Sequence, residues 1–184
     1  MKTIMASVGI AACIFMYFMF NDLWLNKLNH GTFTGKVEKQ HISDFEFQTA
    51  EGDTISIYDF KGKIVVIDCW YTYCGVCYKK FPAVQIVYDK LKNNPEVVFF
   101  ALHSRIERNE NRKSKPETVE TGLKILKKDG YTFPCYSIDI DNPKLEELGV
   151  DAYPTVLIFD RESNLIFRGS IENAERYIKK LIKQ

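Results

Sequence analysis

The strongest constraint on the fold of this 184-residue chain is a pair of cysteines, Cys74 and Cys77, directly behind an apolar run. The run, residues 64–70, does not alternate and therefore predicts a strand covered on both faces of a sheet. Only residues 71–73 separate it from Cys74, so the strand leads almost directly into a helix. The N-terminus of a helix favours an anion and would stabilise a thiolate on Cys74. Cys77 lies one turn further on the same face and can close a disulfide with it.

A CxxC motif alone fits half of a zinc site, a structural disulfide or a redox pair. Zinc needs about four ligands, normally from a second CxxC or paired histidines. The chain has neither, and its histidines are His30, His41 and His103. We therefore expect no metal site and no cofactor. The remaining cysteines, Cys13, Cys69 and Cys135, lie in apolar stretches that are typical of free, buried thiols.

Length and charge favour one globular domain without a nucleic-acid partner. A chain of this length fills one core comfortably. The 25 basic and 24 acidic residues leave a net charge of +1, so no broad basic surface is expected.

The N-terminal residues 1–20 contain a run of 17 mostly apolar residues, 4–20. This is near the lower length limit of a membrane-spanning helix, and an uncleaved signal anchor is the preferred interpretation. Residues 10–13 (IAAC) also resemble a bacterial lipobox with Cys13 as the acylated residue, and a cleaved soluble form is the third alternative. Residues 21–40 show no sustained period and are interpreted as a tether.

The domain is expected to comprise residues 41–184, in which strands and helices alternate as in α/β proteins. The patterns predict two hairpins and three further helices besides the one that follows Cys74. The expected hairpins are 42–47 with 54–58 and 155–160 with 164–168; further strands are 64–69, 96–102 and 133–140; the helices are 79–91, 116–128, 142–149 and 171–181.

Two motifs carry a resemblance to a known family. Residues 70–77 (WYTYCGVC) with Phe81-Pro82, and residues 152–155 (AYPT), resemble the thioredoxin superfamily. The Gly52 hairpin, residues 60–63 (FKGK) and the inserted segment 116–140 resemble its TlpA/ResA-like membrane-anchored members. The resemblance implies a thioredoxin-like fold: a central mixed sheet flanked by helices, with an N-terminal β-hairpin, an inserted helix and strand, and a preceding membrane anchor. Strand 64–69 would lie between 96–102 and 155–160, and Cys69 and Cys135 would be too far apart to pair.

The same resemblance implies roles for single residues. Cys74 is the expected nucleophile and Cys77 the resolving thiol, while buried Asp68 would accept the proton of Cys77. Pro154 matches the cis-proline that faces the cysteines, which leaves the backbone of Tyr153 to pair with an extended substrate. The expected substrate-binding residues are Trp70, Tyr73, Gly75, Val76 and Tyr153.

Two positions depart from the family pattern. Lys80 stands where TlpA-like chains often have Glu, so it is expected to modulate the dithiol by favouring its thiolate. The dipeptide between the cysteines is Gly75-Val76, without the usual proline, and Tyr73 replaces a common tryptophan.

These observations predict a membrane-tethered, extracytoplasmic (periplasmic) protein-disulfide oxidoreductase. Its partners would be disulfide-bearing protein substrates, a membrane or periplasmic thiol reductant donor, and the membrane itself. The alternative is a metallochaperone for copper or cytochrome assembly that binds metal with the same thiols. A peroxidase would need a Thr-x-x-Cys motif, which Thr72 does not supply.

Overall fold

The computed structural model describes residues 2–30, 35–106 and 116–182; within the first helix, side chains are described for 13–21 and 23–28. These residues form an eight-stranded sheet in the order β1-β8-β7-β4-β5-β6-β2-β3. The strands are β1 (Lys36–His41), β2 (Glu46–Gln48), β3 (Thr54–Ser56), β4 (Ile64–Trp70), β5 (Val97–Arg105), β6 (Cys135–Asp139), β7 (Thr155–Phe159) and β8 (Asn164–Gly169). The helices are α1 (Lys2–His30), the 3-10 helix η1 (Ile57–Phe60), α2 (Gly75–Leu91), α3 (Thr121–Lys128), α4 (Pro143–Glu147) and α5 (Ile171–Leu181).

Strand β4, which leads to the cysteines, lies in the middle of the sheet. It runs parallel to β5 and antiparallel to β7, so that Asp68 is in register with Ala101 on one side and Val156 on the other. All seven of its residues are buried. The prediction that this apolar run forms a strand covered on both faces is therefore confirmed, and so are its predicted neighbours, β5 and β7.

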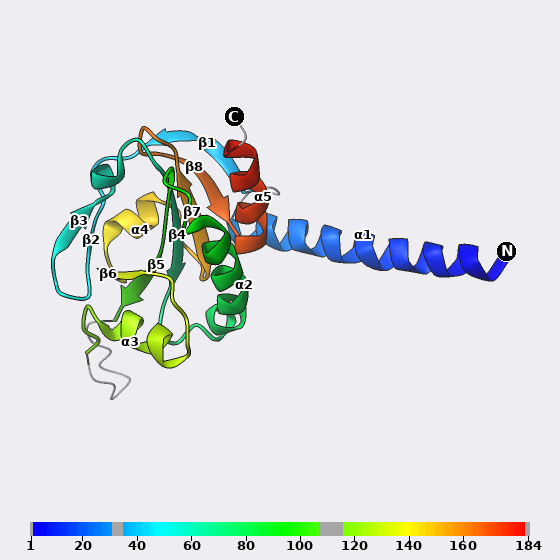
Figure 1. Ribbon diagram of the computed structural model, residues 1–184, viewed down its shortest axis with the longest axis horizontal. Helices are drawn as coiled ribbons and strands as arrows, with labels where there is room; N and C mark the ends of the chain where they lie inside the picture. Colours follow the sequence, from blue (N-terminus) through cyan, green and yellow to red (C-terminus); the bar gives the residue numbers. More distant parts are fainter. Residues whose placement is uncertain (1, 31–34, 107–115, 183–184) are drawn as a thin grey trace.

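Helices cover both faces of the sheet (Figure 1). Helices α2, α3 and α5 share one core cluster with the β4 residues Ile64, Val66 and Trp70. The other core cluster contains residues of α4 and η1 and the buried side chains of Ile42 and Phe45. The β4 residues in this cluster are Val65, Ile67 and Cys69. Because side chains alternate along a strand, Asp68 faces the same side as Val66 and Trp70, toward α2 and α5.

Cys69 and Cys135 are free and buried, as predicted, whereas the same prediction is wrong for Cys13, which is free and exposed on α1. They belong to the two different core clusters, so their side chains lie on opposite faces of the sheet. Strand β5 also separates them, since Cys69 is in register with Leu102 and Cys135 with Ala101.

The expectation of a tether without regular structure over residues 21–40 is wrong for most of its length. Helix α1 continues to His30, and β1 pairs antiparallel with β8 from Lys36 to His41; residues 31–34 lie outside the described residues. Strand β1 is an edge strand that is exposed at five of its six positions. None of its side chains is buried, so it shows no apolar alternation that a sequence pattern would reveal.

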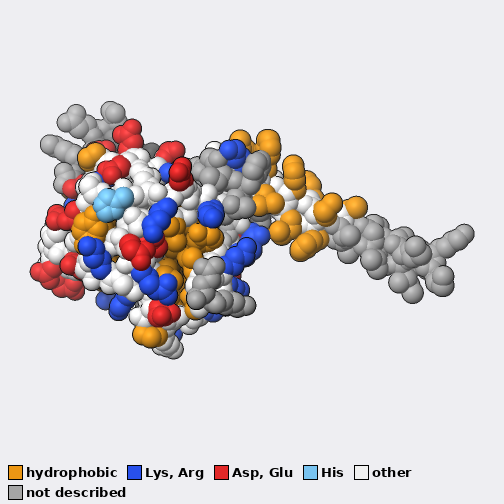
Figure 2. All heavy atoms as spheres, turned by 90° about the horizontal axis from the view of Figure 1, so that it is seen from above, with side chains coloured by type: hydrophobic (Ala, Val, Ile, Leu, Met, Phe, Trp, Pro, Cys, Tyr) orange, Lys and Arg blue, Asp and Glu red, His pale blue; other side chains and the backbone are white. Residues whose placement is uncertain are grey.

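Helix α1 projects from the domain, and its described outer part carries exposed apolar side chains (Figure 2). Where it meets the domain, Asn26 is 3% exposed, and its Oδ1 accepts the backbone N–H of Ser170 at 3.1 Å. Within the described residues, we find no helix whose length and apolar character would let it cross a membrane.

Candidate active site

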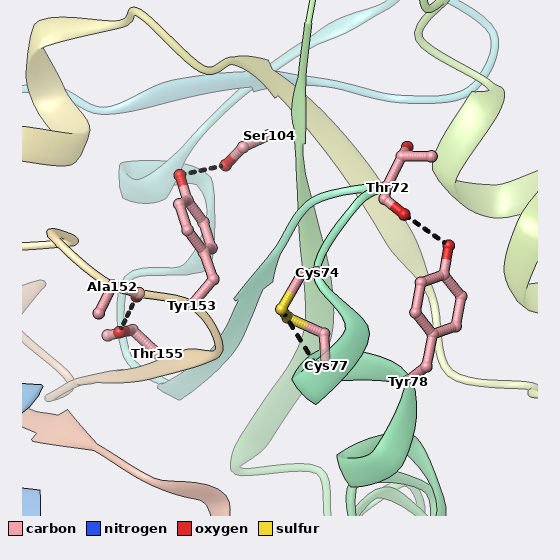
Figure 3. The surroundings of a disulfide bond; sticks show 8 residues. All are labelled: Thr72, Cys74, Cys77, Tyr78, Ser104, Ala152, Tyr153 and Thr155. Atoms are coloured by element: carbon pink, nitrogen blue, oxygen red, sulfur yellow. Dashed lines mark hydrogen bonds between the residues drawn. A yellow bond between two sulfur atoms is a disulfide. The ribbon is translucent and has the colours of Figure 1, made fainter.

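Cys74 and Cys77 form a disulfide at the start of α2 (Figure 3). Cys74 is the N-cap residue, and its Sγ accepts the backbone N–H of Cys77 at 3.1 Å. Cys77 is fully buried, whereas Cys74 retains 5% exposure. The helix N-terminus thus contacts the sulfur of Cys74, which is the more exposed of the two cysteines.

The loop between β4 and α2 is held by two hydrogen bonds. The hydroxyl of Tyr78 donates to the carbonyl of Thr72 at 3.0 Å (Figure 3). Thr72 Oγ1 lies 2.9 Å from Nε2 of His103 on β5, which is fully buried. Burial lowers the pKa of His103 to about 4, against the opposing effect of Glu117, so this ring is neutral at pH 7. The loop is therefore fixed from the side of β5.

The segment around Pro154 lies on the other side of the disulfide. The Tyr153–Pro154 peptide bond is cis, as the resemblance implies. The hydroxyl of Tyr153 donates to Ser104 Oγ at 2.9 Å, and its ring meets that of Tyr71 with centroids 5.1 Å apart. Thr155 Oγ1 donates to the carbonyl of Ala152, which tightens the turn (Figure 3).

Asp68 is a buried carboxyl group on the face of β4 that α2 covers. It is 1% exposed, and neither of its oxygens has a hydrogen-bond partner among the described residues. Burial, and secondarily the negative charge of Glu172, raise the pKa of Asp68 to about 8. A carboxyl with such a pKa exchanges its proton near neutral pH, which is the property required of a general base or acid.

The residues expected to bind substrate are divided between surface and core. Tyr73 is 44% and Val76 54% exposed, and Gly75 between the cysteines is exposed as well. Trp70, in contrast, is fully buried against the rings of Tyr78, Phe81 and His103. The expectation that Trp70 contacts substrate does not hold in this structure, because its side chain forms part of the core.

Lys80 is paired with Glu172 of α5. The Lys80 Nζ to Glu172 Oε1 distance is 2.5 Å, and both side chains are about two-fifths exposed, 40% and 39%. Burial alone would raise the pKa of Glu172, but the hydrogen bond from Lys80 and its own backbone N–H lower it overall. The carboxylate of Glu172 thus compensates the positive charge of Lys80. Lys80 alone is therefore not expected to stabilise a thiolate at the dithiol.

Sequence reasoning missed Glu172 and the contact of Thr72 with His103. Glu172 occupies the first turn of α5 after the N-cap residue Ser170, a pattern typical of any helix start. Its place near the site depends on the order β4-β7-β8, which no local pattern reveals. Likewise, His103 reaches Thr72 because β5 is parallel to β4 and Trp70 is in register with His103.

The two histidines whose side chains the structure describes, His41 and His103, bond to other partners than the cysteines. His103 is committed to the core, and Nδ1 of His41 lies 3.3 Å from Asn164 Oδ1 on β8, while the side chain of His30 is outside the described residues. In the part of the chain that the structure describes, no three His, Cys, Asp or Glu residues form a group that would hold a metal ion.

Comparison with known proteins places this arrangement in a family. The model of the AhpC/TSA family matches residues 39–168, which include both cysteines and Pro154. The chain belongs to the AhpC/TSA family. Among curated relatives, it is 30% identical over 162 residues to the thiol-disulfide oxidoreductase ResA of Bacillus thuringiensis subsp. konkukian, covering 84% of this chain and 86% of that protein. It is also 27% identical over 129 residues to the thioredoxin-like protein YneN of Bacillus subtilis, covering 70% and 68%.

Solved structures confirm the fold of this family member. The thioredoxin domain of a thiol-disulfide oxidoreductase from Bacteroides vulgatus superposes with a TM-score of 0.60 at 19% identity, covering 79% of this chain and 98% of that domain. The exposed lipoprotein thioredoxin of Streptococcus pneumoniae gives a TM-score of 0.57 at 23% identity, covering 75% and 99%. The thioredoxin-like fold inferred from the sequence is confirmed.

Proposed function

We propose that this chain is a thiol-disulfide oxidoreductase that reduces disulfide bonds of exported proteins. One observation carries the proposal: a disulfide at a helix N-terminus whose outer sulfur, on Cys74, receives a backbone N–H, while its inner cysteine is fully buried. The two thiols of the reduced form therefore have unequal access to a substrate. The relationship to ResA at 30% identity supports the same activity.

The reaction follows from this asymmetry. The thiolate of Cys74 attacks one sulfur of a substrate disulfide, which forms a mixed disulfide and releases the other substrate sulfur as a thiolate. Cys77 then loses its proton and attacks Cys74 Sγ, which closes the disulfide seen here and releases the second substrate thiolate. Two electrons pass to the substrate, and each released thiolate takes up a proton.

Asp68 is the base that the second step requires. Cys77 is buried, so its proton has no direct access to water. Asp68 lies on the face of β4 that packs against α2, and its raised pKa of about 8 gives it a proton affinity close to that of a thiol. Proton transfer between groups of similar pKa needs little free energy, so Asp68 is suited to deprotonate Cys77.

The exposed rim of the site provides the substrate contact. Tyr73 and Val76 present exposed side chains close to Cys74 in the sequence, and the cis bond between Tyr153 and Pro154 supports pairing of the Tyr153 backbone with an extended peptide. Such a surface suits unfolded or loop segments around a disulfide better than a small charged thiol compound.

The N-terminal segment is proposed to keep the domain at a membrane in an extracytoplasmic compartment. The support is the apolar run of residues 4–20 and the exposed apolar side chains of α1, among them Phe15, Met16 and Phe18. A membrane or periplasmic thiol donor would then return the Cys74–Cys77 disulfide to the dithiol.

The activity is tested by reduction of insulin disulfides with dithiothreitol as electron donor. We expect activity from the parent chain and none from Cys74→Ser, while Cys77→Ala should accumulate mixed disulfides that identify the substrates. Titration of the reduced chain with Cu(I) tests the metallochaperone alternative. Tight copper binding without insulin reduction would replace the proposal by that alternative.

The direction of electron flow is tested by equilibrating the chain with glutathione buffers. A reductant should have a potential below about −200 mV, on the side of thioredoxins at about −270 mV. A value near about −120 mV, as for strong oxidants, would make the protein a disulfide-forming enzyme instead.

A further inference from the structure

A second carboxyl group, that of Glu172, lies on the same side of the sheet as Asp68. Asp68 is in register with Val156 on β7, and Val156 is in register with Gly169 at the end of β8. Glu172 follows three residues later in the first turn of α5, and α5 packs beside α2 over this face (Figure 1). The chain thus brings the start of α5 toward the strand position that carries Asp68.

The ion pair with Lys80 fixes Glu172 in this position. Lys80 lies on α2, one turn beyond Cys77, and its Nζ is 2.5 Å from Glu172 Oε1. Glu172 is also at the N-terminus of α5, where the helix dipole favours a negative charge. Glu172 therefore remains ionised at neutral pH, between a buried carboxyl group and solvent.

Among the groups near Asp68, Glu172 and its partner Lys80 are the ones that carry a charge at neutral pH. The register neighbours on β5 and β7 are Ala101 and Val156, which do not titrate. On the same face of the sheet, helix α2 carries Cys74, Cys77 and Lys80, and α5 carries Glu172, the partner of Lys80. Two further thiols are those of Cys69, on the opposite face of β4, and Cys135, on β6. Burial raises the pKa of Cys69 well above the ordinary value of a thiol and that of Cys135 to about 12, so both are protonated at neutral pH.

We propose that the Lys80–Glu172 pair is a positioning element of the dithiol site that sets, through its charges, how readily Asp68 takes the proton of Cys77. The inference rests on the proposed function and adds two residues to it. The negative charge of Glu172 favours the protonated form of Asp68 and so raises the pKa of that carboxyl. Lys80 opposes that influence while it holds the carboxylate in place. The balance of the two charges decides how much Asp68 is available as a base at neutral pH.

The sign of each charge gives opposite predictions for the two partners. Glu172→Gln removes the negative charge and leaves Lys80, which favours the ionised forms of Asp68 and Cys77. Lys80→Met leaves Glu172 uncompensated, which disfavours the same ionised forms. Asp68 and Cys77 are both anionic when ionised. The direction in which each substitution moves the pKa is therefore the same for both groups, whichever of them is observed.

The test is stopped-flow reduction of an aromatic disulfide, 5,5′-dithiobis(2-nitrobenzoate), by the reduced full-length chain between pH 5.5 and 9.5. The first thiolate released reports attack by Cys74, and the second reports resolution by Cys77. We expect the pH midpoint of the second phase to move down by roughly half to one unit in Glu172→Gln and up by a similar amount in Lys80→Met. The double variant Lys80→Met/Glu172→Gln should lie between the single variants, near the parent.

The controls separate this inference from the function beneath it. A purely structural ion pair between α2 and α5 would make both single variants and the double variant change in the same direction, which would overturn the inference. If Asp68→Asn slows the second phase while the Lys80 and Glu172 variants leave its midpoint unchanged, the inference fails and the proposed function stands. If Asp68→Asn has no effect on either phase, the role of Asp68 in the proposed function fails as well.

Discussion

At the scale of single residues, the two cysteines of one disulfide have different surroundings. Cys74 caps α2 and is 5% exposed, whereas Cys77, one turn further in, is fully buried. A helix N-terminus stabilises a thiolate at its cap, while burial without a partner disfavours one. The roles proposed for the two cysteines, nucleophile and resolving thiol, therefore rest on a difference of one helical turn in their positions.

Alkylation measures this difference directly. We expect iodoacetamide to modify Cys74 of the reduced chain first at about pH 6, because it has both the accessible sulfur and the stabilised thiolate. Peptide mass spectrometry of samples quenched at increasing times gives the order of modification. Buried Cys69 and Cys135 serve as internal controls that should remain unmodified, and faster modification of Cys77 would reverse the assignment of the two roles.

Asp68 predicts a pH dependence of stability. Its carboxyl has an ordinary pKa of 3.8, which applies to the unfolded chain, and a pKa of about 8 in the folded chain. The folded state holds the proton more tightly, so the free energy of unfolding falls as pH rises from about 4 to about 8 and then levels off. Asp68→Asn should remove this dependence and be more stable than the parent at high pH, by on the order of a few kcal/mol.

Urea unfolding of the oxidised proteins at pH 5 and pH 8 checks this expectation, because the disulfide then keeps Cys74 and Cys77 from titrating. Asp53→Asn, at an exposed turn, is the matched control and should follow the parent at both pH values. An Asp68→Asn variant that loses as much stability as the parent between the two pH values would contradict the burial argument.

At the scale of elements, sequence patterns succeed where the determinant is local. Strand β4 was predictable because an unbroken apolar run reports burial on both faces, and the start of α2 because a short loop must follow it. Strand β1 was missed because an exposed edge strand has no apolar period. The place of Glu172 was missed because two successive strand pairings, β4 with β7 and β7 with β8, bring α5 to the site, and no neighbour in sequence reveals them.

Helix α3 shows how closely the elements around the site pack. A Cβ atom at Gly122 would lie 2.6 Å from His103 Cβ and 3.0 Å from Cys135 Sγ. Gly122→Ala should therefore destabilise the chain by about 1–3 kcal/mol, although alanine favours a helix by about 1 kcal/mol over glycine.

Chemical denaturation of Gly122→Ala beside the parent gives this difference. Gly75→Ala is the control for helix propensity alone, since no heavy atom lies within 4 Å of its added Cβ. Equal stabilisation by both substitutions would mean that α3 can move away from β5 at no cost.

At the scale of the whole molecule, the N-terminal helix and the catalytic domain are joined by a specific contact. The side-chain oxygen of buried Asn26 accepts the backbone N–H of Ser170, the N-cap residue of α5. Strand β1, which follows α1 in the chain, pairs with β8 at the edge of the sheet. A segment interpreted from sequence as a tether therefore contains structure at both ends. Helix α5 links α1 to the dithiol, because its N-cap residue contacts Asn26 and its residue Glu172 pairs with Lys80 of α2. A membrane attachment through α1 would therefore hold the dithiol at a defined place relative to the bilayer.

The attachment itself is the last prediction. We expect the full chain, expressed in a bacterium, to sediment with membranes and to resist a high-salt wash, because residues 4–20 are apolar and the described side chains from Ile14 to Phe18 are exposed. A chain that begins at Asn21 should be soluble and still reduce insulin. Mass spectrometry of the purified N-terminus distinguishes the two modes of attachment: an uncleaved anchor keeps its N-terminal peptide intact, whereas lipidation would make Cys13 the acylated first residue, a form that Cys13→Ser cannot produce. A parent chain found wholly in the cytosol would contradict both modes and with them the extracytoplasmic role.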